Sequence, residues 1–103
     1  MPVQTKNELL ELLRRHDETI REFGVKRLGI FGSFVRDAGE KESDVDLLVE
    51  FYPDEKTYDN FLNLSEFLED ILGRSVELVT TESLSPHIGP AILREVEYVS
   101  AGD

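Results

Sequence analysis

The chain has 103 residues, a net charge of −11 at pH 7 and no cysteine. This length suits one domain over residues 1–103, and the charge argues against direct nucleic-acid binding because an acidic surface repels phosphate backbones. Disulfides and thiolate metal sites are excluded, and the lack of an apolar leader or a membrane-length apolar run predicts a cytoplasmic protein without a membrane partner.

The first third of the sequence predicts a helix, a strand and a short second helix. Residues 6–22 have the spacing of an amphipathic helix, which Thr5 or Asn7 could cap and Gly24 could end. Residues 25–31 are typical of a buried strand, and a short helix is expected over residues 33–36. The polar residues 37–43 predict a loop.

The rest of the chain predicts two more strands and two more helices. The clearest strand covers residues 44–52, where apolar side chains occupy alternate positions. A second amphipathic helix is expected over residues 58–72, stopped by Gly73. A strand over residues 75–80 and a helix from about residue 90 to residue 99 complete the pattern.

This order of elements, α-β-α-β-α-β-α, predicts an α/β (α+β) fold in which a small mixed sheet is flanked by helices. The first two strands are joined by a short segment, which favours antiparallel pairing. The third strand follows a full helix, which favours a parallel crossover onto the same sheet.

Two aspartates stand two positions apart at the start of the clearest strand. Side chains at i and i+2 of a strand point to the same face, with Cα atoms about 6.5–7 Å apart. The carboxylates of Asp44 and Asp46 would therefore repel one another unless a cation lies between them. Mg²⁺ prefers such oxygen ligands, often together with substrate phosphates. The simpler alternative is two solvent-exposed acids without a metal.

The turn after the first strand strengthens the metal hypothesis. If the first two strands pair antiparallel, the end of one lies beside the start of the other, and this turn lies next to the two aspartates. Gly32 lets the backbone approach a ligand closely, and Ser33 offers a hydroxyl and an amide to an anion. Arg36, one turn later, could reach the same phosphates.

Gly32-Ser33, ten intervening residues and then DVDLLV over residues 44–49 resemble the signature of the polymerase-beta-like nucleotidyltransferase superfamily. The small size and the order of elements are similar to its minimal nucleotidyltransferase (MNT) branch over nearly the whole chain. The resemblance implies ATP as substrate and Mg²⁺ as cofactor. It also implies that Gly32, Ser33 and Arg36 bind the nucleotide, while Asp44 and Asp46 bind the metal and are catalytic.

The resemblance implies a third catalytic and metal-binding carboxylate on the third strand. At that position this chain has Glu77, in the segment Val-Glu-Leu-Val, where the family usually has Asp. The longer side chain of Glu77 is expected to affect the geometry of metal binding and the rate of the transfer reaction. A second departure is Asp37, because it follows Arg36 where the family often has glycine.

MNT proteins are commonly antitoxins of HEPN-domain ribonucleases. The resemblance therefore implies transfer of AMP from ATP to a tyrosine hydroxyl of such a toxin. An alternative from a different class is a binding module, weak or inactive in catalysis, that neutralises a partner ribonuclease by contact. Transfer to a small molecule is disfavoured, because larger relatives of that kind have an extra domain for the acceptor. The first helix also leaves some surface for a partner or a homodimer.

The histidines and tyrosines give no specific signal. His16 and His87 are expected at the surface, because no second His or Cys stands at metal-binding spacing. Tyr52, Tyr58 and Tyr98 are expected at the rim of the core, and the sequence selects none of them to stack on adenine.

Overall fold

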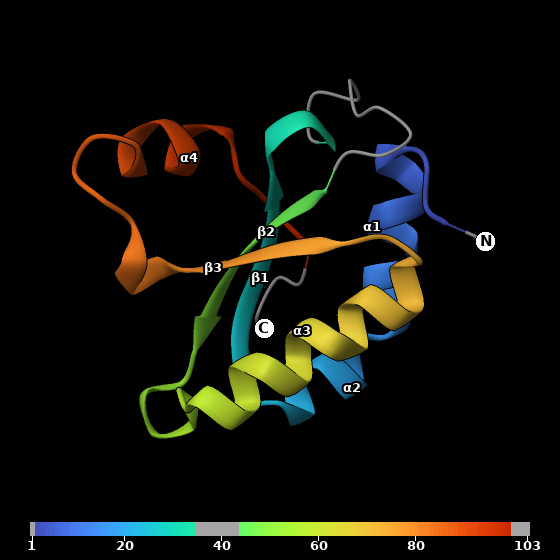
Figure 1. The fold of residues 1–103 in the computed structure, drawn as a ribbon, viewed down its shortest axis with the longest axis horizontal. Helices are drawn as coiled ribbons and strands as arrows, with labels where there is room; N and C mark the ends of the chain where they lie inside the picture. Colours follow the sequence, from blue (N-terminus) through green and yellow to red (C-terminus); the bar gives the residue numbers. More distant parts are fainter. Residues whose placement is uncertain (1, 35–43, 100–103) are drawn as a thin grey trace.

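The computed structural model describes residues 2–34 and 44–99, and of Ser33 only the backbone (Figure 1). The helices are α1 (Lys6–Arg15), α2 (Asp17–Glu22), α3 (Tyr58–Leu72) and α4 (Gly89–Glu95). The strands are β1 (Val25–Phe31), β2 (Val45–Phe51), β3 (Val76–Thr80) and β4 (Glu97–Tyr98). Single 3-10 turns follow β1, β2 and β3 as η1 (Gly32–Phe34), η2 (Pro53–Glu55) and η3 (Thr81–Ser83). Within the described ranges, no helix has the length and apolar character needed to cross a membrane.

The strands form one mixed sheet in the order β3-β2-β1-β4. β1 is antiparallel to both of its neighbours, β2 and β4, whereas β2 and β3 are parallel. The predicted pairing of the first three strands is thereby confirmed. Helices α1, α2 and α3 gather on one side of the sheet and α4 lies on the other (Figure 1). This arrangement confirms the predicted α/β class.

The core lies between the sheet and the first three helices. Apolar side chains at helical spacing meet the inward-facing residues of β1 and β2, and the buried set includes Leu9, Leu13, Ile20, Leu28, Ile30, Val45, Leu47, Val49, Leu64, Leu68 and Leu72. Burial of this face fixes the orientation of β2, because successive side chains of a strand point to opposite faces. Asp46 therefore stands on the face that α1 to α3 do not cover.

The predicted helix over residues 6–22 is two helices. Thr5 caps α1 as part of a capping box, but the backbone of His16 leaves helical geometry with a ψ of 19°, and α2 begins at the next residue. The His16 ring packs edge-on against Phe67 of α3, with 5.7 Å between the ring centroids. His16 is consequently half-buried, which corrects its predicted surface position, whereas His87 is exposed as expected.

The predicted helix over residues 90–99 is wrong in its second half. α4 ends at Glu95, and Val96 is extended with a ψ of 138°. The chain then pairs as β4 with the outer edge of β1, and the Val99 amide donates to that strand at 2.8 Å. This pairing satisfies backbone groups that a bare edge would leave open. Gly29 makes room for it, because a Cβ at that position would lie 2.5 Å from Val96 Cγ2.

The remaining boundaries agree closely with the sequence pattern. α3 covers the predicted residues 58–72 and ends at Gly73, whose φ of +68° is left-handed. The short helix expected over residues 33–36 begins as η1. Its last two residues and the predicted loop over residues 37–43 lie outside the described residues.

Candidate active site

The end of β1 lies directly beside the start of β2. Phe31 is the register partner of Asp46, so the next residue, Gly32, comes against the aspartate. Gly32 has a φ of +77°, and a Cβ built there would lie 2.1 Å from Asp46 Oδ2. Glycine is thus required for the backbone conformation and for the close approach of the carboxylate. The predicted juxtaposition of the glycine turn and the aspartate is what the structure has.

A second acidic side chain stands beside Asp46 on the neighbouring strand. Asp46 and Glu77 are register partners in the parallel pair of β2 and β3, so their side chains share one face of the sheet. The two carboxyl groups are joined by a side-chain hydrogen bond. The extra methylene of Glu77, compared with aspartate, does not take its carboxyl group out of reach of Asp46.

The surroundings of Asp46 disfavour its negative charge. Burial, the hydrogen bond with Glu77 and the charges of Glu77, Asp44 and Glu95 together raise the pKa of Asp46 from 3.8 to about 6, and burial is the largest of these causes. A carboxyl hydrogen bonded to another carboxyl carries a proton on one of the two. Three further acidic side chains therefore act on Asp46 at this end of the sheet.

The donor set suits a hard divalent cation. Carboxylate oxygens are the ligands that Mg²⁺ prefers, and a cation would offset the repulsion that Glu77, Asp44 and Glu95 exert on Asp46. Asp44 lies immediately before β2 and is exposed. Within residues 2–34 and 44–99, no three His, Cys, Asp or Glu side chains are already gathered in metal-binding geometry. This end of the sheet is a candidate magnesium site because its carboxylates are suitable ligands, although they are not already arranged as a complete coordination shell.

Glu95 is the member of the site that sequence reasoning missed. Its carboxylate Oε2 accepts a hydrogen bond of 2.8 Å from the Gly32 backbone amide, across 63 positions of sequence. No local pattern marks this residue, because its position depends on how α4 and β4 return to β1. From the sequence, Glu95 was marked only by lying within the nearly whole-chain resemblance to the family.

For two of the predicted nucleotide-binding residues, Ser33 and Arg36, the structure does not describe the side chain. The backbone of Ser33 lies in η1, directly after Gly32, while its side chain is not described. Arg36 and the unexpected acid Asp37 lie outside the described residues. Their roles remain predictions.

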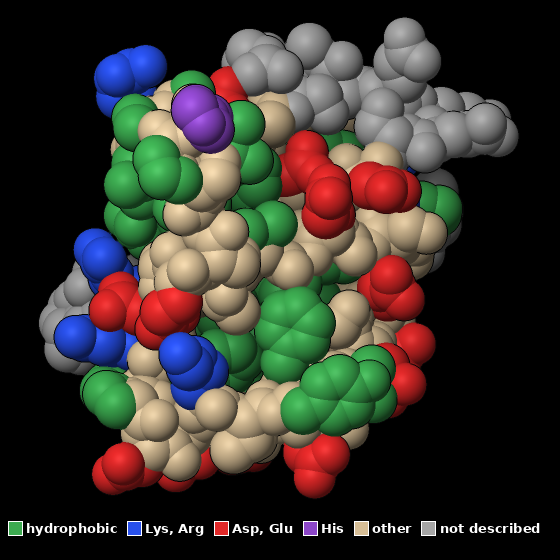
Figure 2. Space-filling view, turned by 60° about the vertical axis from the view of Figure 1, so that its left-hand side comes forward, with side chains coloured by type: hydrophobic (Ala, Val, Ile, Leu, Met, Phe, Trp, Pro, Cys, Tyr) green, Lys and Arg blue, Asp and Glu red, His purple; other side chains and the backbone are tan. Residues whose placement is uncertain are grey.

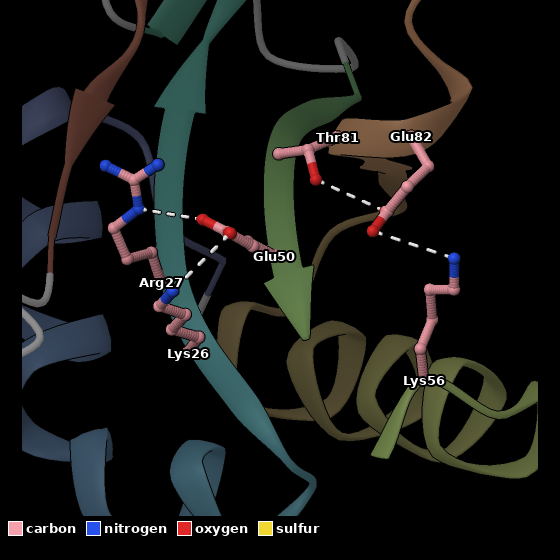
Figure 3. Close-up of polar contacts among 6 residues, drawn as sticks. All are labelled: Lys26, Arg27, Glu50, Lys56, Thr81 and Glu82. Atoms are coloured by element: carbon pink, nitrogen blue, oxygen red, sulfur yellow. Dashed lines mark hydrogen bonds and ion pairs between the residues drawn. The ribbon is translucent and has the colours of Figure 1, made fainter. Parts of the chain in front are cut away.

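Charged side chains continue along the same face of β2, but with opposite signs paired (Figure 3). Glu50, four residues after Asp46, accepts from Arg27 Nε at 3.0 Å and lies 3.9 Å from Lys26 Nζ. The Arg27 guanidinium also lies over the Tyr98 ring, 4.3 Å from its centroid. Glu50 has basic partners, whereas the charges that act on Asp46 are acidic. This contrast distinguishes Asp46 from an ordinary acid on the sheet surface.

The acid of η3 is paired in the same way as Glu50. Glu82 lies 3.6 Å from Lys56 Nζ and accepts from Thr81 Oγ1 at 3.2 Å (Figure 3). Figure 2 shows this side of the molecule, where acidic and apolar side chains share one surface. In the α4 region, the apolar side chains of Ile88 and Leu93 are more than half exposed, at 58% and 52%.

The tyrosines occupy different positions at the rim. Tyr98 is half-buried beneath Arg27, while Tyr52 and Tyr58 are exposed, at 46% and 76%. The expectation of rim positions is met by Tyr98, and the other two are more exposed than a core rim would make them.

A groove of about 260 Å³ lies elsewhere, between the N-terminal segment and α1, lined by Pro2, Val3, Gln4, Glu8, Glu11, Leu12 and Arg15. Its charged groups already have partners. Glu8 accepts the Thr5 amide at 3.2 Å, and Arg15 pairs with Glu11 at 2.8 Å. The carboxylates around Asp46 are therefore the better candidate for chemistry.

Residues 8–99 match the family model described as nucleotidyltransferase domain. The chain belongs to the nucleotidyltransferase domain family. This confirms the resemblance and the predicted enzyme class, because the match covers nearly the whole chain, including both halves of the signature. The Gly32 turn and the acidic pair of β2 and β3 thus lie within a nucleotidyltransferase.

Individual relatives agree with this assignment. The chain is 42% identical over 100 residues to the protein adenylyltransferase MntA of Thermococcus cleftensis, covering 96% of this chain and 100% of that protein. A solved structure named putative minimal nucleotidyltransferase is 34% identical, with a TM-score of 0.72 over 85% of this chain and 93% of the other. A complex of a tri-AMPylated Shewanella oneidensis HEPN toxin with an MNT antitoxin contains a chain with a TM-score of 0.63. That likeness covers 88% of this chain and 71% of the other at 18% identity, and it shows a shared fold alone.

Proposed function

We propose that this nucleotidyltransferase transfers AMP from ATP to a tyrosine hydroxyl of a HEPN-type toxin in the cytoplasm and so acts as its antitoxin. Two comparisons support the proposal. The relative at 42% identity is named a protein adenylyltransferase, and one chain in the complex of an AMPylated HEPN toxin with an MNT antitoxin shares the fold.

The observation that carries the proposal is the pairing of Asp46 with Glu77 beside the Gly32 turn. Strand register brings these residues together, with Gly32 at the end of β1, Asp46 on β2 and Glu77 on the edge strand β3. The acidic pair provides oxygen ligands, and the turn provides backbone that a phosphate can approach closely. Ser33 and Arg36, which follow along the chain, complete the proposed nucleotide-binding set.

Asp44, Asp46 and Glu77 are the residues that would hold Mg²⁺. When bound, the metal supplies positive charge that offsets both the phosphates and the clustered carboxylates. The fit rests on the register that places Asp46 beside Glu77, with Asp44 two positions earlier, because a cation would offset the repulsion among these carboxylates.

The proposed reaction is a displacement at the α-phosphorus of ATP. The acceptor oxygen forms a bond to that phosphorus, and the bond from the phosphorus to the oxygen bridging to the β-phosphate breaks. Pyrophosphate leaves with that oxygen. The acceptor proton passes to a carboxylate of the Asp46–Glu77 pair, which already exchanges a hydrogen bond. Positioning and charge neutralisation supply most of the rate.

Co-expression with the candidate toxin, followed by intact-mass measurement, tests the proposal. We expect the toxin to gain the mass of one or more AMP groups with the wild-type chain. Asp46→Asn should lower the initial rate of transfer from radiolabelled ATP about 100-fold or more. Glu50→Gln is the matched control, because it removes an acid from the same face of the same strand that is paired with Arg27 instead. Equal rates for the two variants would refute the assignment of the site.

A second candidate is neutralisation by contact. The net charge of −11 and the glutamate at position 77 favour it, because an acidic surface can cover a basic ribonuclease cleft without catalysis. The mass measurement separates the two functions. Loss of toxin activity without any added mass, in the presence of ATP and Mg²⁺, would support masking.

A further inference from the structure

Glu95 lies between α4 and β4, and the pairing of β4 with β1 fixes its position. It is the last residue of α4, and Val96 then leads directly into β4. β4 pairs with β1 at Gly29 and Ile30, only two to three residues before Gly32. The strand pairing that anchors the chain after Glu95 therefore belongs to the same strand that delivers the Gly32 turn.

Gly32 is contacted on two sides by carboxylates. Asp46 lies against its α-carbon, where a Cβ would meet Oδ2 at 2.1 Å, and Glu95 accepts its amide hydrogen at 2.8 Å. A backbone amide at the end of a strand needs an acceptor, and a charged acceptor forms a stronger bond than a neutral one. Together the two contacts restrain both the translation of the turn and the direction of its first peptide.

The acceptor of the Gly32 amide is a negatively charged carboxylate in a region that is already acidic. Glu95 adds a negative charge to surroundings that already hold Asp44, Asp46 and Glu77, and it acts on Asp46. A neutral acceptor would avoid that repulsion. The stronger hydrogen bond to Gly32 is the compensating gain that the structure offers.

We propose that Glu95 is a positioning residue that holds the nucleotide-binding turn against Asp46 through the Gly32 amide. The proposal rests on the proposed function, because it assumes that the turn binds ATP. In this arrangement the Gly32 amide donates its hydrogen bond to Glu95 and does not bind a phosphate. Gly32 then contributes to nucleotide binding by lacking a side chain, and the backbone that follows it faces the phosphates.

Two substitutions separate the hydrogen bond from other effects. Glu95→Ala removes the acceptor, whereas Glu95→Gln keeps an oxygen that can accept the Gly32 amide and loses the charge. We expect Glu95→Ala to raise the KM for ATP about tenfold or more and to change kcat less than about threefold, because one charge-assisted hydrogen bond is lost. Glu95→Gln keeps an acceptor but loses the charge, so its KM for ATP should lie between those of the wild type and Glu95→Ala, with kcat within about threefold of wild type.

Glu8 provides the matched control. Its carboxylate likewise accepts backbone amides, those of Gln4 and Thr5, but at the start of α1. Glu8→Ala should lower the thermal midpoint without changing the KM for ATP. A rise in KM after Glu8→Ala equal to that after Glu95→Ala would show general loosening of the fold and would overturn the proposal.

Hydrogen exchange of the Gly32 amide and direct binding of a non-hydrolysable ATP analogue give readouts that need no turnover. We expect Glu95→Ala to speed exchange at Gly32 about tenfold and to weaken analogue binding in proportion to the change in KM. Wild-type exchange, tighter analogue binding, or a Glu95→Gln variant as impaired as Glu95→Ala would each overturn the proposal. A wild-type chain that binds the analogue but modifies no partner would refute the proposed function alone.

Discussion

Asp46 and Glu77 stand at the same level of two parallel strands and share a hydrogen bond although both are acids. Strand register places the two side chains next to one another on the same face of the sheet. The protein therefore holds a repulsive contact in its folded state. That contact has consequences for stability as well as for metal binding.

The first prediction concerns pH. Because the pKa of Asp46 is raised from 3.8 to about 6, the folded chain binds more protons than the unfolded chain between these values. The contribution of Asp46 to the free energy of unfolding is therefore present below pH 4 and is lost as the pH rises through 6. Asp46→Asn should remove this loss and stabilise the fold at pH 7 by about 1 kcal/mol, allowing for solvent screening.

Urea unfolding of the wild type and Asp46→Asn at pH 4 and pH 7 measures this difference. Asp70→Asn, which changes an exposed aspartate of α3, is the control. The stability gain of Asp46→Asn should appear at pH 7 and shrink at pH 4. A variant no more stable than wild type at pH 7 would contradict the raised pKa.

The second prediction concerns magnesium without nucleotide. A cation bound among Asp44, Asp46 and Glu77 stabilises only the folded state, because register creates the site. At ten times its dissociation constant, Mg²⁺ should add about 1.4 kcal/mol, or about 6 °C in Tm. Calorimetry with added Mg²⁺ and then EDTA measures this effect.

Two variants define the origin of the magnesium effect. Asp46→Asn should abolish the rise in Tm, whereas Glu50→Gln, which lies on the same face with a basic partner, should preserve it. An equal rise in Tm for wild type and Asp46→Asn would place the metal elsewhere.

The third prediction compares two glycines. Gly32 and Gly73 both have left-handed φ values, +77° and +68°, so alanine at either should cost about 1 kcal/mol in backbone strain. Only Gly32→Ala also drives a Cβ into Asp46 Oδ2. Both variants should unfold at lower urea concentrations, but only Gly32→Ala should lose binding of an ATP analogue, as measured by calorimetry. Retained binding in Gly32→Ala would show that the close approach to Asp46 is dispensable.

The sequence was sufficient where a local pattern and a packing requirement coincide. Val45, Leu47, Val49 and Phe51 alternate along β2 and pack into the core, and this fixes the side on which Asp46 stands. Gly73 ends α3 where its left-handed backbone is needed. The antiparallel pairing of β1 and β2 followed from the short connection between them, and with it the neighbourhood of Gly32 and Asp46.

The sequence was insufficient where the outcome depends on distant segments. The apolar spacing of residues 90–99 fits a helix. In the structure, however, Glu97 and Tyr98 pair with the edge of β1 as β4. Glu95 reaches Gly32 only because the chain pairs with β1 again after α4. The sequence next to either residue therefore does not predict the contact. The break at His16 likewise accompanies a contact with Phe67, which is far away in the sequence.

The order in which β1, β2, β3 and β4 leave the ribosome differs from their order across the sheet. The turn at Gly32 emerges early, but the strand that carries Glu95 into place is the last described element of the chain. A nascent chain can therefore bury most of its core before its nucleotide site is complete. The contact between Glu95 and Gly32 is expected to form only after β4 has been synthesised.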